Sequence, residues 1–143
     1  MTAALSGLFV ASFLSATVLP MASEGVLIAL LLAGSAPTAA LIAVATLGNV
    51  LGACTGWVLG RTAAPWLTRA FRLSETQRDS ALAALRRRGP PVLLLTWVPF
   101  VGDALTVAAG AIRVPFLVFL GWTAAGKLGR YAVVAWLTLA AST

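Results

Sequence analysis

Four long apolar runs occupy most of this 143-residue chain, and they limit its fold more than any other feature. They span residues 3–34, 37–60, 90–112 and 114–139. About 20 apolar residues suffice to cross a bilayer as a helix. The chain is 60% hydrophobic and 10% charged, whereas soluble domains average roughly 45–50% and 25%. We therefore expect an all-α integral membrane protein that forms a single membrane domain over residues 1–143.

The residue types that are rare or missing argue against several chemistries. Cys54 is the only cysteine, and histidine is absent. Internal disulfides, haem, most zinc sites and histidine-based acid–base catalysis therefore do not fit this chain. We expect no metal and no other cofactor.

The arginines indicate how the chain is oriented. The net charge is +6, and arginines gather between the second and third apolar runs, at positions 61, 69, 72, 78, 86, 87 and 88. The positive-inside rule places this connector, residues 62–89, in the cytoplasm. We expect the arginines beside the apolar runs to meet anionic lipid head groups rather than nucleic acid. These membrane-surface residues are Arg61, Arg86, Arg87 and Arg88.

The connector contains a predicted amphipathic helix over residues 74–88. Ser74 and Gln77 fit a capping box at its start, and a basic last turn followed by Gly89 and Pro90 fits its end. The helix could lie on the inner leaflet of the membrane. A solvated linker helix explains the same pattern, and the sequence leaves both alternatives open.

Glycines recur every four residues along the run 37–60. They share one helix face and allow another helix to approach closely, the small-xxx-small mode of packing in lipid. The sequence does not decide whether that neighbour belongs to the same chain or to a homodimer. Asn49 lies in the same run and needs a hydrogen-bond partner within the protein. The glycines are Gly48, Gly52, Gly56 and Gly60.

Two stretches of the chain repeat one pattern. Residues 17–24 read TVLPMASE and residues 96–103 read TWVPFVGD, so both follow Thr-x-x-Pro-x-x-x-acid. A longer apolar helix carrying Leu-Gly-Arg follows each, at 59–61 and at 128–130. We interpret the chain as a duplicated unit, with one repeat over about 3–61 and the other over about 90–139.

Charge places the two repeats in opposite orientations, as in transporters built from inverted repeats with broken helices. The run 3–34 has 32 residues, too many for one straight span and fewer than the roughly 40 needed for two. We expect Pro20 to break it into a re-entrant hairpin that enters from outside. The run 90–112 would enter from inside, broken at Pro99 and Gly102, although its length also fits one plain span.

Four ionisable residues lie at membrane depth, and a fifth lies close to an interface. An isolated charge near the bilayer centre costs at least roughly 2.5–3.5 kcal/mol, so we expect the acids and bases to face one another or a wet cavity. In that site the cations would attract a phosphate or another anionic head group, and a carboxylate would carry a proton. The alternative is that buried ion pairs only fix helix register. The residues are Glu24, Asp103, Lys127 and Arg130, with Arg113 at the interface.

One short motif supports an enzymatic role, and only weakly. Gly102 and Asp103 match the end of the Gly-x-Gly-Asp motif of intramembrane aspartyl proteases, which need two aspartates. Residue 100 is Phe, and Glu24 is the only other acid at membrane depth. We expect no enzymatic activity.

The spaced motifs resemble the DedA (VTT-domain, SNARE-associated) superfamily, and within it the small bacterial YqaA-like branch. The resemblance covers roughly residues 5–136. It rests on the two Pro-x-x-x-acid stretches, on Gly-Asn-x-x-Gly at 48–52, and on the series from Trp97 through Gly110 and Gly126-Lys127 to Arg130-Tyr131.

The resemblance implies a multi-pass protein of the bacterial inner membrane with two opposed re-entrant hairpins. Relatives are linked to flipping or scrambling lipids and to dependence on the proton gradient. Glu24 matches the acid of the first hairpin and Pro99 the proline of the second. Larger members place arginines where this chain has Thr96 and Gly102, so anion binding would pass to Arg113, Lys127 or Arg130.

Three functions follow as hypotheses. The first is a flippase or scramblase for an anionic or phosphate-bearing lipid, such as a phospholipid or polyprenyl phosphate. The second is a proton-coupled transporter of a small solute or ion, with Glu24 and Asp103 as proton carriers. The third is a membrane scaffold that transports nothing. Membrane lipids are the expected partners, and protons and a second copy of the chain remain open alternatives.

Overall fold

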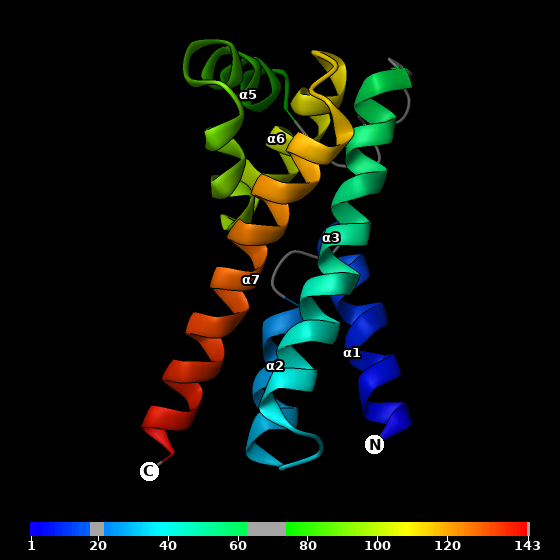
Figure 1. Cartoon of the computed structure of the whole chain (residues 1–143), viewed down its shortest axis with the longest axis vertical. Helices are drawn as coiled ribbons and strands as arrows, with labels where there is room; N and C mark the ends of the chain where they lie inside the picture. The colour runs from blue at the N-terminus through cyan, green and yellow to red at the C-terminus, as the bar shows by residue number, and fades with distance from the viewer. Residues whose placement is uncertain (18–21, 63–73, 143) are drawn as a thin grey trace.

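A computed structural model describes residues 1–17, 22–62 and 74–142. Its elements are helices, so the expected all-α fold is confirmed for this part of the chain (Figure 1). In chain order they are α1 (Thr2–Ser15), α2 (Ala22–Leu32), α3 (Thr38–Thr62), α5 (Glu75–Arg88), the 3₁₀ helix η1 (Pro90–Trp97), α6 (Val101–Ala111) and α7 (Phe116–Ala141).

The two longest helices are α3 and α7, with 25 and 26 residues. At 1.5 Å per residue, α3 and α7 measure roughly 38 and 39 Å, more than the roughly 30 Å of a bilayer core. Among the described residues, α3 is the helix that is long and apolar enough to cross a membrane by length and composition. Helix α7 is as long but carries Lys127 and Arg130.

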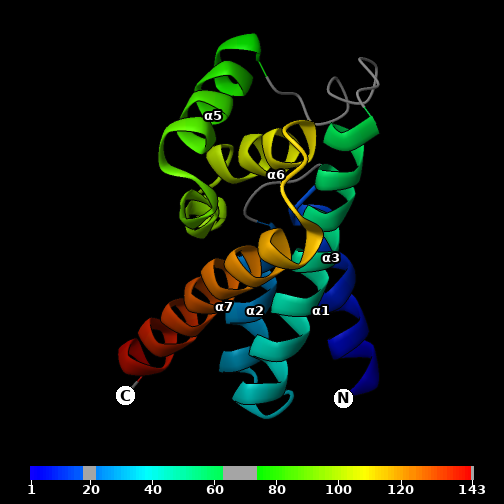
Figure 2. The same ribbon diagram turned by 45° about the horizontal axis from the view of Figure 1, so that its top comes forward.

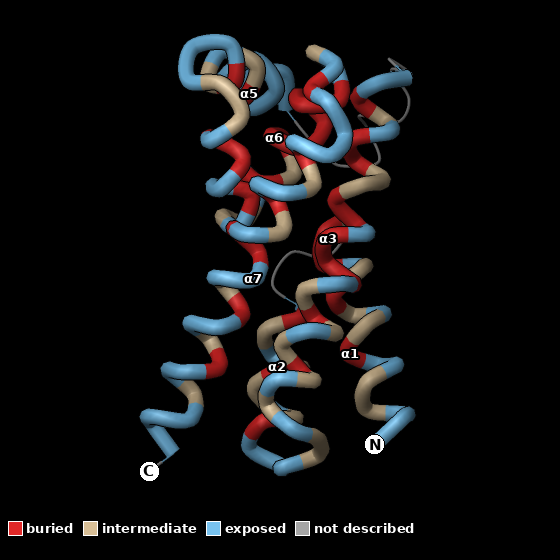
Figure 3. The backbone as a smooth tube through the Cα atoms, viewed as in Figure 1, coloured by how far each residue is buried: buried red, intermediate tan, exposed pale blue. Residues whose placement is uncertain are grey.

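Large apolar side chains cover the outer surface of the helices. Leu47 on α3 is 55% exposed, and Leu117 and Trp136 on α7 are 78% and 68% exposed. Figure 3 shows exposed positions along the outward sides of α1, α3 and α7, with buried positions facing inward. A surface with this much exposed apolar area suits a lipid environment, since soluble proteins rarely expose extended apolar patches.

The run 3–34 contains two short helices. Helix α1 starts and helix α2 ends at the same end of the molecule, where the N-terminus and the α2–α3 turn lie (Figure 1). They have 14 and 11 residues, so neither alone reaches across a bilayer core. The predicted break at Pro20 lies outside the described residues.

The run 90–112 is also broken, and its reading as one plain span is therefore wrong. Helix η1 ends at Trp97 and α6 begins at Val101. Phe100 has a positive φ of 66°, and a Cβ on Gly102 would overlap the carbonyl oxygen of Thr96. The chain therefore doubles back tightly around Pro99. The first arm is a 3₁₀ helix rather than the expected α-helix, and its 8 residues exceed the usual 3–4.

The two broken segments enter the molecule from opposite ends. Figures 1 and 2 show η1 and α6 at the end that carries α5, and α1 and α2 at the end that carries both termini. The bend between η1 and α6 lies near mid-height (Figure 1). The acid of each Pro-x-x-x-acid stretch occupies the same place, the first turn of the second short helix: Glu24 in α2 and Asp103 in α6.

The helix predicted over 74–88 is confirmed. Helix α5 has the expected capping box, in which Gln77 N–H donates to Ser74 Oγ at 3.1 Å and Ser74 N–H donates to Gln77 Oε1 at 3.0 Å. Its apolar residues Ala81 and Leu85 are buried in a cluster that includes Leu105 of α6. Packing within the chain therefore accounts for the amphipathic pattern.

Glycines of α3 contact helices of the same chain. A Cβ on Gly48 or Gly52 would lie 2.6 Å from a carbonyl oxygen of α1. Further along, a Cβ on Gly60 would overlap the carbonyl of Val107, and a Cβ on Gly110 of α6 would overlap the carbonyl of Trp57. Helix α3 therefore approaches α1 with its first half and α6 with its second half, and Gly56 between them is buried.

Substituting Gly110 by alanine is expected to destabilise the fold by about 1–3 kcal/mol or more, because two backbones must separate to admit one methyl group. The matched control is Gly129→Ala. Gly129 lies within α7 with open space around its Cα, so alanine should stabilise by up to about 1 kcal/mol. Unfolding in detergent measures both. Equal effects of the two substitutions would contradict backbone contact between α3 and α6.

Candidate functional site

Arg130 of α7 contacts both broken segments. Its guanidinium forms a salt bridge with the carboxylate of Glu24 in the first turn of α2. The same side chain donates a hydrogen bond of 2.8 Å to the carbonyl oxygen of Trp97, the last residue of η1. Both charged side chains are largely shielded, with 15% and 13% of their surfaces exposed. One side chain of α7 therefore contacts both α2 and the end of η1.

A directed chain of hydrogen bonds starts at Lys127. Lys127 Nζ donates to Asn49 Oδ1, and Asn49 Nδ2 donates to the Tyr131 hydroxyl at 2.8 Å. Ser23 Oγ donates to Ser15 Oγ at 3.2 Å and lies 2.8 Å from the Tyr131 hydroxyl. Because a serine hydroxyl has a single proton, Tyr131 donates to Ser23. These hydrogen bonds thus link α7, α3, α2 and α1.

A small polar cavity lies beside these groups. Its volume is about 10 Å³, enough for about one water molecule. Its charged lining residues are Asp103, Lys127 and Arg130, and Thr96 and Pro99 of the second bend also line it. Glu24 is not among the lining residues and reaches the cavity through its partner Arg130.

We call the buried and partly buried polar side chains around this cavity the polar layer; they are Ser15, Ser23, Glu24, Asn49, Asp103, Lys127, Arg130 and Tyr131. The polar layer lies between two apolar clusters. On α3, Asn49 separates Leu41 and Ala45 of one cluster from Ala53 and Trp57 of the other. Glu24 and Asp103 each lie in a first helical turn, where the helix dipole favours a negative charge. The breaks in the two segments therefore place both acids where an acid is best tolerated inside an apolar protein.

The predicted site residues divide into those inside this layer and those outside it. Glu24, Asp103, Lys127 and Arg130 lie in it, with Pro99 and Gly102 in the neighbouring bend. Arg113 is exposed in the turn between α6 and α7, at the end of the molecule that carries α5 (Figure 1). Its assignment to the same site as Lys127 is a misplacement, because α6 ends at Ala111 before the chain turns back. The arginines Arg61, Arg86, Arg87 and Arg88 are exposed as well.

Sequence reasoning missed three members of the layer. Tyr131 is fully buried and serves as the centre of the hydrogen-bond chain, whereas its residue type suggests an interface anchor or core filler. Ser15 and Ser23 are buried too. The one signal available was position, since both serines flank the predicted break at Pro20 and Tyr131 follows Arg130.

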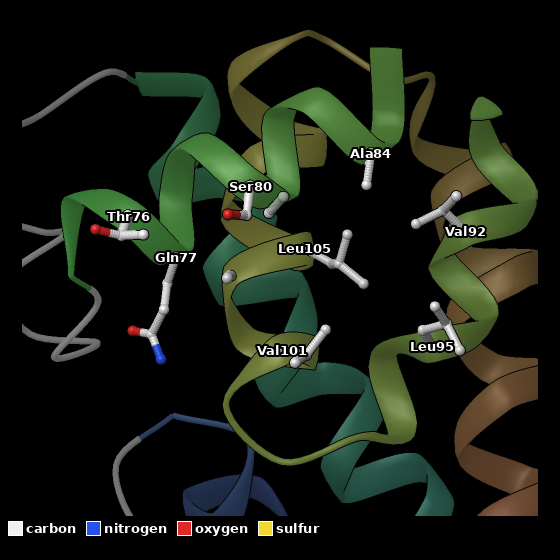
Figure 4. Close-up of a pocket in the computed structure, with 10 residues that line it drawn as sticks. Thr76, Gln77, Ser80, Ala84, Val92, Leu95, Val101 and Leu105 are labelled. Atoms are coloured by element: carbon white, nitrogen blue, oxygen red, sulfur yellow. The ribbon is translucent and has the colours of Figure 1, made fainter. Parts of the chain in front are cut away.

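A second, larger cavity lies between α5, η1 and α6. It measures about 240 Å³ and is lined mostly by apolar side chains. Figure 4 shows Val92 and Leu95 of η1 and Val101 and Leu105 of α6 pointing into the same space, with Thr76 and Gln77 at one end. The charged residues of the polar layer do not line it.

The fold and the site define a class: a helical membrane protein in which two broken segments meet at a buried layer of ionisable and hydrogen-bonded side chains. The family model for the VTT domain matches residues 19–139. The chain therefore belongs to the VTT-domain, or DedA, family, and its resemblance to the YqaA-like branch is confirmed.

The relatives match over nearly full length. Inner membrane protein YqaA of Escherichia coli (strain K12) and its namesake in Shigella flexneri are each 42% identical over 137 residues, 94% of this chain and 91% of theirs. An uncharacterized protein of Haemophilus influenzae is 38% identical over 138 residues, 92% of this chain and 85% of its own. No solved structure matches the chain.

Proposed function

We propose that this protein moves an anionic or phosphate-bearing lipid, such as a phospholipid or polyprenyl phosphate, between the leaflets of the bacterial inner membrane. In this proposal α1–α2 and η1–α6 are opposed re-entrant hairpins of an inverted repeat. The lipid head group passes where their bends meet, and its acyl chains stay in the surrounding bilayer. Transport involves no bond-breaking chemistry.

The observation that supports the proposal most is the double attachment of Arg130. One side chain binds Glu24 near the first bend and the Trp97 carbonyl at the second. A phosphate competes for a guanidinium because two of its oxygens match the planar fork. A head group that binds Arg130 therefore weakens the contact between the bends, which couples binding to opening.

The dimensions of the polar cavity support a closed resting state. Its volume of about 10 Å³ cannot hold a lipid head group, so the bends must separate during passage. Lys127 and Arg130 both line the cavity and are positioned to meet the phosphate once it enters. Asn49 keeps the Lys127 ammonium in place until then.

The proposed location rests on the relatives and on the distribution of charge. YqaA of Escherichia coli is named as an inner membrane protein, and we extend that location to this chain. Residues 62–89 face the cytoplasm in the proposal, since Arg86, Arg87 and Arg88 at the end of α5 follow the positive-inside rule.

Purified protein in liposomes tests the proposal. Vesicles of phosphatidylethanolamine and phosphatidylglycerol carry a trace of head-group-labelled phosphatidylglycerol, and a membrane-impermeant quencher reports the label that reaches the outer leaflet. We expect exchange in vesicles with wild-type protein and almost none in protein-free vesicles. Equal rates in the two preparations would reject lipid transport and favour a scaffold.

A proton-coupled transporter of a small solute or ion is the second candidate, and Asp103 favours it. Among the described residues, its carboxylate has no ion-pair partner within 4 Å although it shares a cavity with Lys127. A carboxylate without a fixed partner can take and release a proton. A pH-sensitive dye inside the liposomes should show proton flux that Asp103→Asn abolishes. Absence of flux in wild type under an imposed gradient rules this candidate out.

A further inference from the structure

A second group of charged and aromatic side chains lies at the end of α3, away from the polar layer. Figures 1 and 2 both place this end beside the α6–α7 connection. The contact is direct, because a Cβ on Gly110 would lie 2.8 Å from the backbone nitrogen of Arg61. Arg113 N–H donates to the Gly110 carbonyl at 3.0 Å. The backbones of Arg61 and Arg113 therefore both lie next to Gly110.

Trp57 forms a fixed platform at this place. Its indole N–H donates to the carbonyl of Val114 at 3.1 Å, and its ring centroid lies 5.2 Å from that of Phe116 and 6.1 Å from that of Phe119. The Arg61 guanidinium carbon lies 5.1 Å from the centroid of the Trp57 ring. This position over the ring pre-orders Arg61, whose guanidinium forms no salt bridge among the described residues and can bind an anion.

Arg113 occupies a backbone conformation that needs support. Its φ of 59° lies in the left-handed region, which is uncommon for a residue with a side chain. The neighbouring contacts hold the turn in this shape, since Val114 N–H donates to the Ala109 carbonyl at 2.9 Å and its own carbonyl accepts from Trp57. Arg61 and Arg113 are both exposed and form no salt bridge among the described residues.

We infer that Arg61, Trp57 and Arg113 form a binding site for the phosphate of an anionic lipid head group at the cytoplasmic end of α3. Two arginines supply forked donors that match phosphate oxygens. Trp57 fits the interfacial level at which aromatic residues gather, and the ring of Phe116, 41% exposed, offers apolar surface beside it for the acyl part. The inference rests on the proposed membrane orientation but not on transport.

Lipid binding to the full-length protein tests the site. Protein in nanodiscs of phosphatidylcholine with a minority of phosphatidylglycerol is analysed by native mass spectrometry for bound phosphatidylglycerol. We expect each of Arg61→Gln and Arg113→Gln to weaken binding about fivefold, the effect of one interfacial cation. Arg61→Lys keeps the charge but loses the planar fork and should fall between wild type and Arg61→Gln.

The control removes equal charge elsewhere. Arg86→Gln with Arg87→Gln changes two exposed arginines at the end of α5, which meet head groups only as surface charges, and should weaken phosphatidylglycerol binding less than Arg61→Gln with Arg113→Gln. Wild-type binding by Arg61→Gln/Arg113→Gln, or an equal loss in the control pair, would overturn the site. A further arm adds inorganic phosphate to nanodiscs of phosphatidylcholine alone. Saturable binding there that Arg61→Gln abolishes would assign the site to free phosphate instead of a lipid.

The outcomes of the two functional experiments are separable. Loss of head-group binding in Arg61→Gln with normal leaflet exchange supports this site and leaves transport to the polar layer. Wild-type protein that exchanges no lipid yet binds phosphatidylglycerol through Arg61 and Arg113 would reject the transport proposal and retain the site.

Discussion

Replacing Arg130 by methionine is expected to destabilise the protein by about 3–5 kcal/mol, the usual cost of removing one partner of a buried ion pair. The substitution leaves the Glu24 carboxylate largely buried without its cation, and the second oxygen of Glu24 has no hydrogen-bond partner among the described residues. It also frees the Trp97 carbonyl at the second bend. Unfolding of the purified protein in detergent measures the loss.

A second substitution separates the charge effect from general damage to α7. Glu24→Gln in the Arg130→Met background removes the orphaned charge and should restore most of the lost stability, so a double-mutant cycle should give a large coupling energy. Additive effects would show that Glu24 and Arg130 do not interact in the folded protein.

Lys127→Met is expected to change stability little but to remove leaflet exchange. The ammonium is 4% exposed, so its loss relieves the cost of burying a charge, several kcal/mol. Against this, Asn49 Oδ1 loses its donor, which costs about 1–3 kcal/mol. In transport the substitution removes a charged hydrogen bond to phosphate, and the rate should fall roughly 10- to 100-fold.

Thr123→Val is the matched control for Lys127→Met. Thr123 lies one turn earlier on α7, is fully buried, and has no hydrogen-bond partner for its hydroxyl among the described residues. Valine has nearly the same shape and should preserve both stability and exchange. A comparable loss of exchange in Thr123→Val would mean that packing of α7, rather than the Lys127 charge, limits the rate.

The positions of several helices could be predicted because apolar runs and helix-breaking residues are local features of the sequence. The runs 37–60 and 114–139 became α3 and α7, and the capping box at Ser74 marked the start of α5. The form of η1 could not be predicted, because the 3₁₀ conformation of Pro90–Trp97 depends on contacts such as that of the Leu94 carbonyl with Gly126.

The site was predictable in composition but not in pairing. The sequence identifies two acids and two bases at membrane depth, yet Lys127 and Arg130 are equally plausible partners for Glu24 by spacing. In the structure, Glu24 forms a salt bridge with Arg130, and Lys127 donates a hydrogen bond to Asn49. Tyr131 escaped prediction because its partners Ser23 and Asn49 lie on other helices, and Arg113 was misplaced because the end of α6 sets its position.

The most direct measurement compares leaflet exchange of labelled phosphatidylglycerol by wild-type protein and by Lys127→Met. Both are reconstituted at the same protein-to-lipid ratio, after equal folding has been verified in detergent. If the polar layer between the two bends passes the head group, wild type exchanges the lipid and Lys127→Met approaches the protein-free rate. Equal exchange by the two proteins would contradict a role for this layer in transport.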